Sequence, residues 1–222
     1  MIDLAARAVT GGAALPEMPD PVDAQDRTTG DEDAVFVARC RRGDPDAFAV
    51  LVRRHQKRML NIAYRMIGDY GEACDVVQEA FLSAWRGIGN FRGEARFSTW
   101  LCGIVLNQAR NHLRQRSVHS GREGAPFDDP ARSEEGSQDP PSREESAVER
   151  LERRELEARV QEGIGSLESG QREVLVLRDI QGYSYEEIGV MLKLPEGTVR
   201  SRLFRARNAL KESLLKVWGD LR

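Results

Sequence analysis

The clearest structural pattern of the sequence lies in residues 184–211, SYEEIGVMLKLPEGTVRSRLFRARNALK. Ser184 and Glu187 stand three residues apart and predict a capping box at the start of a short helix. The tripeptide Lys193-Leu194-Pro195 predicts a tight break after it. A second helix is then expected from about Glu196 to Val217. Short helix, brief turn and longer second helix are typical of a helix-turn-helix.

The second of these helices has a basic surface. Five basic residues and no acidic one lie between positions 197 and 211. In a helix-turn-helix the second helix enters the major groove, where arginine can donate two hydrogen bonds to guanine. A basic helix face is most often only solvated, but the capped helix and turn beside it favour duplex DNA binding.

A second candidate surface lies in residues 91–116. The loop FRGEARF, residues 91–97, places arginines between aromatic residues, and Ser98 can cap the helix that follows. Opposite the apolar side of that helix, amide, guanidinium and indole groups recur at helical spacing: Trp100, Asn107, Arg110, Asn111 and Arg114. Such groups can stack on and hydrogen-bond unpaired bases. An ordinary solvated face with Trp100 in the core is an equally good interpretation of this helix alone.

The remaining apolar patterns also predict helices. Asp44 followed by Pro45 marks a helix start, and Gly68 a helix end. Asp69 with Glu72 resembles a capping box before a further helix. Shorter helices are expected at about 32–42, 151–164 and 168–179. The prediction is therefore an all-α protein.

Charge and composition divide the chain into four parts. Residues 1–33 and 119–149 each have a net charge of -6, whereas 34–118 has +7 and 150–222 has +2. We expect a disordered tail at 1–30, a helical domain at 31–116, a flexible acidic linker at 117–147 and a second helical domain at 148–222. The segregation suggests polyanion binding by the helical parts; acidic segments that merely aid solubility would explain it equally well.

Composition also excludes several classes of protein. Hydrophobic residues make up 40% and charged residues 31%, and no apolar run reaches membrane-helix length. Neither a basic start nor a CxxC pair is present, which argues against a secretory signal, a disulfide framework and a zinc site. We expect a cytoplasmic protein with no membrane insertion, cofactor, metal site or catalytic residue.

Three segments together resemble the bacterial sigma-70 superfamily, specifically the small extracytoplasmic-function (ECF) sigma factors. They are DVVQEAFLSAWR (75–86), FRGEARFSTWLCGIVLNQARNHLR (91–114) and the stretch 184–211 quoted above. The resemblance implies a sigma-2 helical bundle and a sigma-4 helix-turn-helix domain without an intervening sigma-3 domain. It implies a dissociable subunit that binds core RNA polymerase, recognises the -35 and -10 promoter elements and promotes melting, and it leaves catalysis to the polymerase.

The same resemblance implies roles for particular residues. A docking face for the clamp helices of the polymerase β′ subunit would comprise Asp75, Gln78, Glu79 and Arg86. An unpaired base of the -10 element would be bound by a set of eight residues: Phe91, Arg92, Arg96, Trp100, Asn107, Arg110, Asn111 and Arg114. The -35 element would meet Thr198, Arg200, Ser201, Phe204 and Arg205. The second domain is expected to dock on the β-flap, and an anti-sigma factor is an expected partner.

Two other functions stay open at this point. A stand-alone helix-turn-helix regulator would bind duplex DNA as a dimer, but it would not need the face with Trp100, Asn107 and Asn111. A small nuclease could use Asp75 and Glu79, although no further acid or histidine accompanies them. One departure from the family concerns Lys193, which lies where many such motifs have glycine; a positive φ there would cost roughly 1 kcal/mol.

Overall fold

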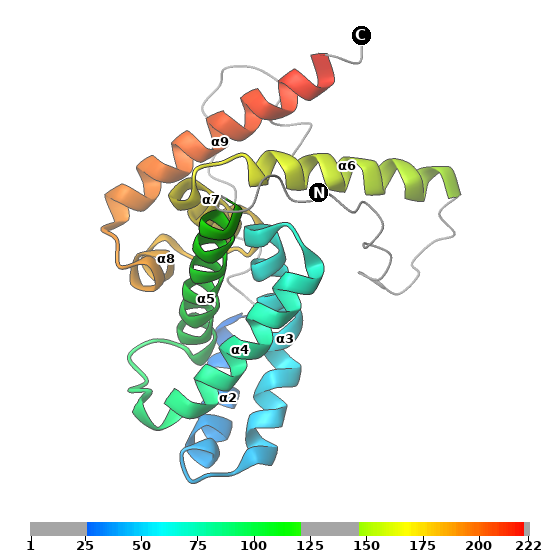
Figure 1. Cartoon of the computed structure of the whole chain (residues 1–222). Helices are drawn as coiled ribbons and strands as arrows, with labels where there is room; N and C mark the ends of the chain where they lie inside the picture. The colour runs from blue at the N-terminus through cyan, green and yellow to red at the C-terminus, as the bar shows by residue number, and fades with distance from the viewer. Residues whose placement is uncertain (1–25, 121–146, 220–222) are drawn as a thin grey trace.

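The computed structural model describes residues 26–120 and 147–219, and every regular element in these ranges is helical (Figure 1). The first range contains α2 (Asp26–Cys40), α3 (Pro45–Ile67), α4 (Tyr70–Gly87), the 3₁₀ turn η1 (Ile88–Asn90) and α5 (Phe97–Ser120). The second contains α6 (Ala147–Gly165), α7 (Ser169–Leu175), the π-helical turn η2 (Val176–Ile180), α8 (Tyr185–Leu192) and α9 (Glu196–Gly219).

The prediction of an all-α fold is confirmed. Helix α2 begins before residue 31 and α5 continues past residue 116, so both extend beyond the segment we assigned to the first domain. The predictions for residues 1–25 and 121–146 lie outside the described residues. None of the helices within 26–120 and 147–219 combines the length and the apolarity needed to cross a lipid bilayer.

The ends of α3 and α4 are set by local capping. The Asp44 side chain accepts hydrogen bonds from two backbone N–H groups at the start of α3, and Pro45 is its first residue. Gly68 ends α3 with φ at +90°, a conformation that glycine adopts without steric cost. Asp69 then accepts a hydrogen bond from the Glu72 backbone at 2.8 Å. The predicted start and end of α3 and the predicted start of α4 are confirmed.

The first half is a bundle built on α3, α4 and α5. Figure 1 shows α3 beside α4, with α5 crossing them and α2 near one end. Leu51, Ile62, Leu101 and Leu106 are fully buried where these helices meet. Each such side chain contributes about 1.5–3 kcal/mol on burial. The core thus fixes which side of α4 and of α5 faces outward.

Helices α8 and α9 form the helix-turn-helix. The Ser184 hydroxyl accepts from the Glu187 backbone at 3.2 Å, and the Glu187 carboxylate accepts from the Ser184 backbone at 2.9 Å. The predicted capping box is therefore confirmed. After α8 the chain turns closely over Gly189, where a Cβ atom would lie 2.9 Å from the Leu194 carbonyl oxygen. Lys193 has φ 54° and ψ 48°, so the turn does need a left-handed residue.

We expect Lys193→Gly to stabilise the helix-turn-helix by about 1 kcal/mol, because glycine removes the clash of a Cβ atom in the left-handed conformation. Hydrogen exchange of the α8 and α9 amides in the full chain measures this gain. Lys211→Gly, within α9, is the contrasting control and should destabilise by about 1 kcal/mol. Faster exchange in Lys193→Gly than in the unaltered chain would contradict the assignment.

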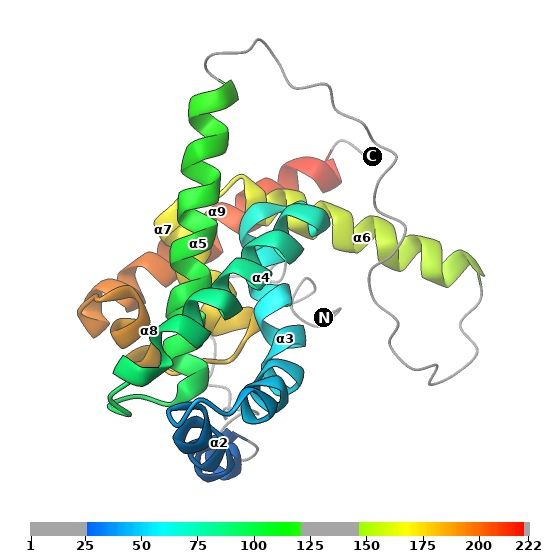
Figure 2. The same ribbon diagram turned by 60° about the horizontal axis from the view of Figure 1, so that its bottom comes forward.

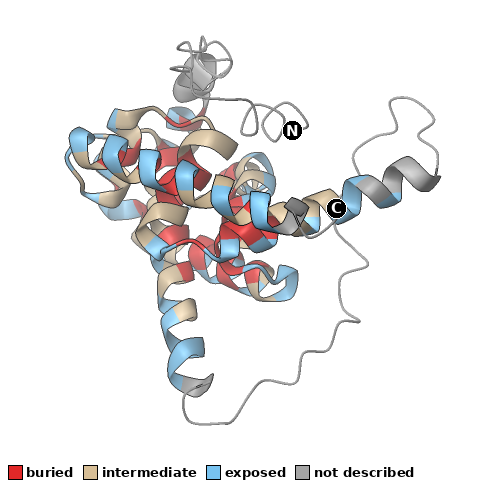
Figure 3. Ribbon diagram, turned by 90° about the horizontal axis from the view of Figure 1, so that it is seen from above, coloured by how far each residue is buried: buried red, intermediate tan, exposed pale blue. Residues whose placement is uncertain are grey.

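The two halves of the chain lie in contact. Helix α3 packs against α6 and η2, and α5 packs against α8. Figure 2 shows α8 beside α5, while the last turns of α5 extend past the neighbouring helices. Buried residues continue from one half into the other in Figure 3. The sequence predicted two modules on a tether, and it did not reveal this contact.

Candidate nucleic-acid and polymerase interfaces

An aromatic cluster supports the loop between α4 and α5. The Phe91 ring centroid lies 5.0 Å from that of Trp100 and 6.2 Å from that of Phe97. Phe91 and Phe97 are buried, and Trp100 is partly buried. The cluster therefore holds the loop in place and leaves part of the indole accessible. Stacking of Trp100 on a base stays a prediction.

Helix α5 turns its amide side chains outward. Leu106 and Ala109 are buried against α3 and α4, and this orientation exposes Asn107, Asn111 and Arg114. The Asn107 side-chain oxygen accepts a hydrogen bond from Arg110 at 3.0 Å. The structure thus brings Asn107, Asn111 and Arg114 of the predicted -10 set onto the outward side of one helix.

Arg110 joins the two halves of the chain. Its Nη2 donates to Glu173 Oε2 at 2.8 Å, and its Nε donates to the other oxygen of the same carboxylate. Glu173 is a residue of α7 and is buried. The hydrogen bonds that Arg110 donates to this carboxylate raise the pKa of its guanidinium, which stays charged. A residue predicted to reach promoter DNA is therefore held by the other half of the chain.

The loop arginines differ in their surroundings. The Arg92 side chain is 83% exposed and lies 3.8 Å from Glu94. Arg96 lies 3.9 Å from Glu187 of α8. Arg92 thus points to solvent, whereas Arg96 sits where the two halves meet.

Further contacts between the halves involve residues that sequence reasoning missed. Arg58 of α3 donates to the Gln181 carbonyl at 2.9 Å, and its guanidinium lies 4.2 Å from the centre of the Tyr183 ring. Arg65 donates to the side chain of Gln161 at 3.0 Å. These bonds offset part of the cost of withdrawing the two guanidiniums from water.

Arg172 makes a contact of the same kind. It donates to the Met66 carbonyl at 2.6 Å, at the end of α3, and to the carbonyls of Gly165, the last residue of α6, and of Leu167. Last-turn carbonyls of a helix lack partners within the helix, and a guanidinium stabilises them. The contact area between the halves is therefore polar, and it surrounds a buried Tyr183, while the Nε atoms of Arg65 and Arg172 are buried without a hydrogen-bond partner among the described residues.

One sequence signal could have revealed this contact. The residues Glu173 to Leu177 are all buried, so α7 has no solvent-facing stripe at this point. A helix that is buried on all sides must be covered by more than one neighbour. The unbroken apolar run VLVL, directly after a glutamate, indicates a segment that is covered by neighbours on all sides.

Helix α9 presents the predicted duplex-binding face. Phe204 is 68% exposed, and Arg205 and Ser201 are exposed beside it. Arg200 donates to Glu196 at 2.6 Å and lies 4.3 Å from the Tyr185 ring centre. Thr198 is half-buried, and its carbonyl accepts from Ser201. The five predicted residues thus lie on the first turns of α9, away from its core residues Val199 and Leu203.

Helix α4 carries the predicted docking residues on its outer face. Asp75, Gln78, Glu79 and Arg86 are all exposed. Arg86 and Glu79 lie 3.7 Å apart. Leu82 was missed by sequence reasoning; it is 44% exposed at the centre of this face. An apolar centre with a polar rim is the usual anatomy of a protein interface.

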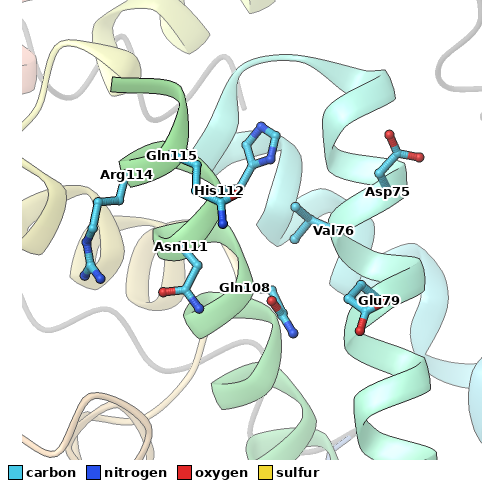
Figure 4. Close-up of a pocket in the computed structure, with 8 residues that line it drawn as sticks. All are labelled: Asp75, Val76, Glu79, Gln108, Asn111, His112, Arg114 and Gln115. Carbon is cyan, nitrogen blue, oxygen red and sulfur yellow. The ribbon is translucent and has the colours of Figure 1, made fainter. Parts of the chain in front are cut away.

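An open groove of about 400 Å³ separates α4 from the end of α5 (Figure 4). Asp75 and Glu79 line it from α4, while Asn111 and Arg114 line it from α5. The predicted docking set and the predicted -10 set therefore border one surface depression.

Comparison with known proteins matches both halves. Residues 51–118 match the family model described as Sigma-70 region 2, and residues 157–210 match the model described as Sigma-70, region 4. The RNA polymerase sigma-H factor of Pseudomonas aeruginosa is 41% identical over 84% of this chain and 95% of its own. The ECF RNA polymerase sigma-E factor of Escherichia coli K12 is 40% identical over 80% of this chain and 92% of its own.

Solved structures show the same likeness. CnrH, in complex with the cytosolic domain of CnrY, has a TM-score of 0.61 and 30% identity, over 83% of this chain and 97% of its own. The sigma factor RpoE of Bartonella quintana, in complex with the anti-sigma factor NepR, shares the fold with a TM-score of 0.56 at 23% identity. With both halves matched in order, the chain belongs to the ECF group of the sigma-70 family of RNA polymerase sigma factors.

Proposed function

We propose that the two helical halves of this sigma factor read different states of promoter DNA. The chain gives core RNA polymerase its promoter specificity and makes or breaks no covalent bond. In the proposal, α5 and the loop before it hold an unpaired base of the -10 element, and α9 reads the duplex -35 element. One observation carries it: a face with exposed amides and a face with exposed arginine lie in separate halves that match separate sigma regions.

The α5 face suits an extruded base. Asn107 and Asn111 can donate and accept hydrogen bonds at a base edge, which suits a base that has lost its partner. Extruding a base costs a few kcal/mol, and stacking with hydrogen bonds can offset that cost. A duplex-only regulator needs no such face, so the stand-alone regulator is not favoured.

The α9 face suits the major groove. Arg205 can donate two hydrogen bonds to guanine, and the exposed ring of Phe204 can contact a thymine methyl group. The 2.6 Å bond to Glu196 restricts the Arg200 side chain before DNA binds. In this proposal the first turns of α9 contact the bases of the -35 element.

The proposed partners follow from the remaining surfaces. The outer face of α4 is assigned to the β′ clamp helices, and the second domain to the β-flap. A regulatory anti-sigma factor is proposed as well, and the solved complex of the relative CnrH with the cytosolic domain of CnrY supports such a partner. We also propose that the protein acts in the cytoplasm, where polymerase transcribes.

The contact between the halves bears on when DNA can be read. Arg110 cannot serve the -10 element while its Nε and Nη2 donate to the Glu173 carboxylate and its Nη1 donates to Asn107. Arg96 is likewise drawn towards Glu187. The described arrangement is proposed to be a closed state, which separates before or during promoter binding.

Arg205→Ala is expected to cost about 1–3 kcal/mol at a single -35 position and to relax specificity there, because it removes a base contact rather than a phosphate contact. Binding of holoenzyme to promoters with each -35 base pair changed in turn measures this. Lys216→Ala, an exposed change near the end of α9, is the control and should leave the pattern unaltered. Uniform weakening on every sequence would instead indicate phosphate contact.

Footprinting tests the proposed function as a whole. The chain with core polymerase is expected to protect both promoter elements and to expose unpaired thymines at the -10 element. The chain alone should give neither result. Full protection of a duplex operator by the chain alone, as a dimer, would support a stand-alone regulator instead.

A further inference from the structure

The turn between α2 and α3 exposes two arginines that no role assigned above uses. Arg41 and Arg42 are both exposed. The neighbouring Arg39 pairs with Asp44 at 2.8 Å. Within the described part of the chain neither Arg41 nor Arg42 has a carboxylate partner. Ion pairs within the described part of the chain therefore do not account for these two charges.

This turn lies against the loop between α4 and α5. The Arg41 guanidinium carbon is 6.0 Å from the centre of the Phe91 ring. Phe91 in turn contacts Trp100, the aromatic residue at the start of the α5 face. The buried Phe91 ring therefore lies between the turn and the start of the proposed base-binding face, and the turn is close to that face.

The backbone holds the turn in one shape. The Arg41 N–H donates to the Val37 carbonyl at 3.0 Å, and the Arg42 N–H donates to the Arg39 carbonyl at 2.9 Å. Gly43 follows with φ at +84°, and its N–H donates to the Cys40 carbonyl. The two guanidiniums are therefore carried by a fixed backbone rather than by a loose segment.

We propose that Arg41 and Arg42 bind backbone phosphates of the single-stranded promoter DNA next to the -10 bases. Arginine presents a planar fork of donors that matches phosphate geometry. Arg92, exposed on the intervening loop, adds a third positive charge along the same surface. The single strand would follow a positively charged surface beside the partly accessible Trp100 ring, and positive charge next to an aromatic ring is typical of single-strand binding. This inference rests on the proposed function of α5.

The test uses holoenzyme containing the double variant Arg41→Gln/Arg42→Gln. Its binding to single-stranded DNA with the -10 sequence is measured at several salt concentrations. The strands either end at the -10 element or continue about four nucleotides beyond it on the 5′ or the 3′ side, a length within reach of a single-strand site. Arg53→Gln, an exposed change on α3, is the matched control.

On the strand whose extension reaches the turn, the slope of log affinity against log salt should fall by about 1.4, which is about 0.7 for each lost phosphate contact. On the unextended strand the slope should stay unchanged, and Arg53→Gln should behave as the unaltered protein. Unchanged slopes on all strands would overturn the proposal. So would a change seen only with duplex DNA.

Two further results separate this inference from its premises. Weaker assembly of the double variant with core polymerase, at unchanged salt slopes, would show that the arginines meet a protein surface and would overturn the phosphate assignment. If unaltered holoenzyme does not prefer the -10 sequence over a scrambled strand, the proposed role of α5 has failed. Circular dichroism of the variants checks that both fold.

Discussion

Glu173→Ala is expected to open the closed arrangement of the chain. The substitution removes both hydrogen bonds that α7 makes to Arg110 and leaves that guanidinium partly buried without its carboxylate. Truncating one member of such a pair costs at least about 2–3 kcal/mol. That loss corresponds to an increase of about 30- to 150-fold in the ratio of open to closed chains. It is the largest change we expect from a single substitution between the halves.

Two measurements on the free chain report this opening. Hydrogen exchange should speed up at amides of α5 and α7 near the contact, and binding to single-stranded -10 DNA should strengthen because Arg110 is released. Glu162→Ala is the control, since Glu162 is exposed on α6. If exchange and DNA binding are the same in Glu173→Ala and the unaltered chain, the pair does not hold the chain closed.

Asn107→Ala is expected to impair promoter opening far more than polymerase binding. A bidentate amide contact to a base is worth about 1–3 kcal/mol, so open complexes should decline by about 5- to 150-fold. Asn107 lies on the exposed face of α5, away from the docking residues on the outer face of α4. The strength of holoenzyme assembly should therefore hardly change.

Permanganate reactivity of unpaired thymines measures promoter opening, and co-purification with core polymerase measures assembly. Gln56→Ala, which removes an exposed amide from α3, serves as the control and should leave both unchanged. Equal loss of opening and assembly in Asn107→Ala would count against a role in base capture.

The features predicted from the sequence are those fixed within a few residues. Asp44 and Gly68 set the ends of α3, and Ser184 with Glu187 caps α8, each through contacts to nearby backbone groups. Comparison with the family's glycine raised a positive φ at Lys193 only as a condition, and the structure shows that this condition holds. Local hydrogen bonding and apolar spacing encode such features directly, which is why the helical fold followed.

The features not predicted depend on how the halves meet. Helical spacing puts Arg110 on the polar side of α5, but it contains no information that Glu173, 63 positions further along the chain, lies opposite. Helical spacing also does not show how deeply a side chain is buried. Trp100 lies on the expected side of α5, and yet its ring packs on Phe91. Leu82 was passed over because a lone leucine on a charged face has no distinctive pattern.

Transcription in vitro tests whether this chain directs core polymerase to promoters. Core polymerase, the purified chain and a library of promoters are combined, and the start sites of the transcripts are sequenced. We expect transcripts from one set of start sites, all downstream of shared -35 and -10 sequences, and none of these without the chain. If the chain leaves start-site choice unchanged and binds duplex DNA tightly by itself, it is not a promoter-specificity subunit.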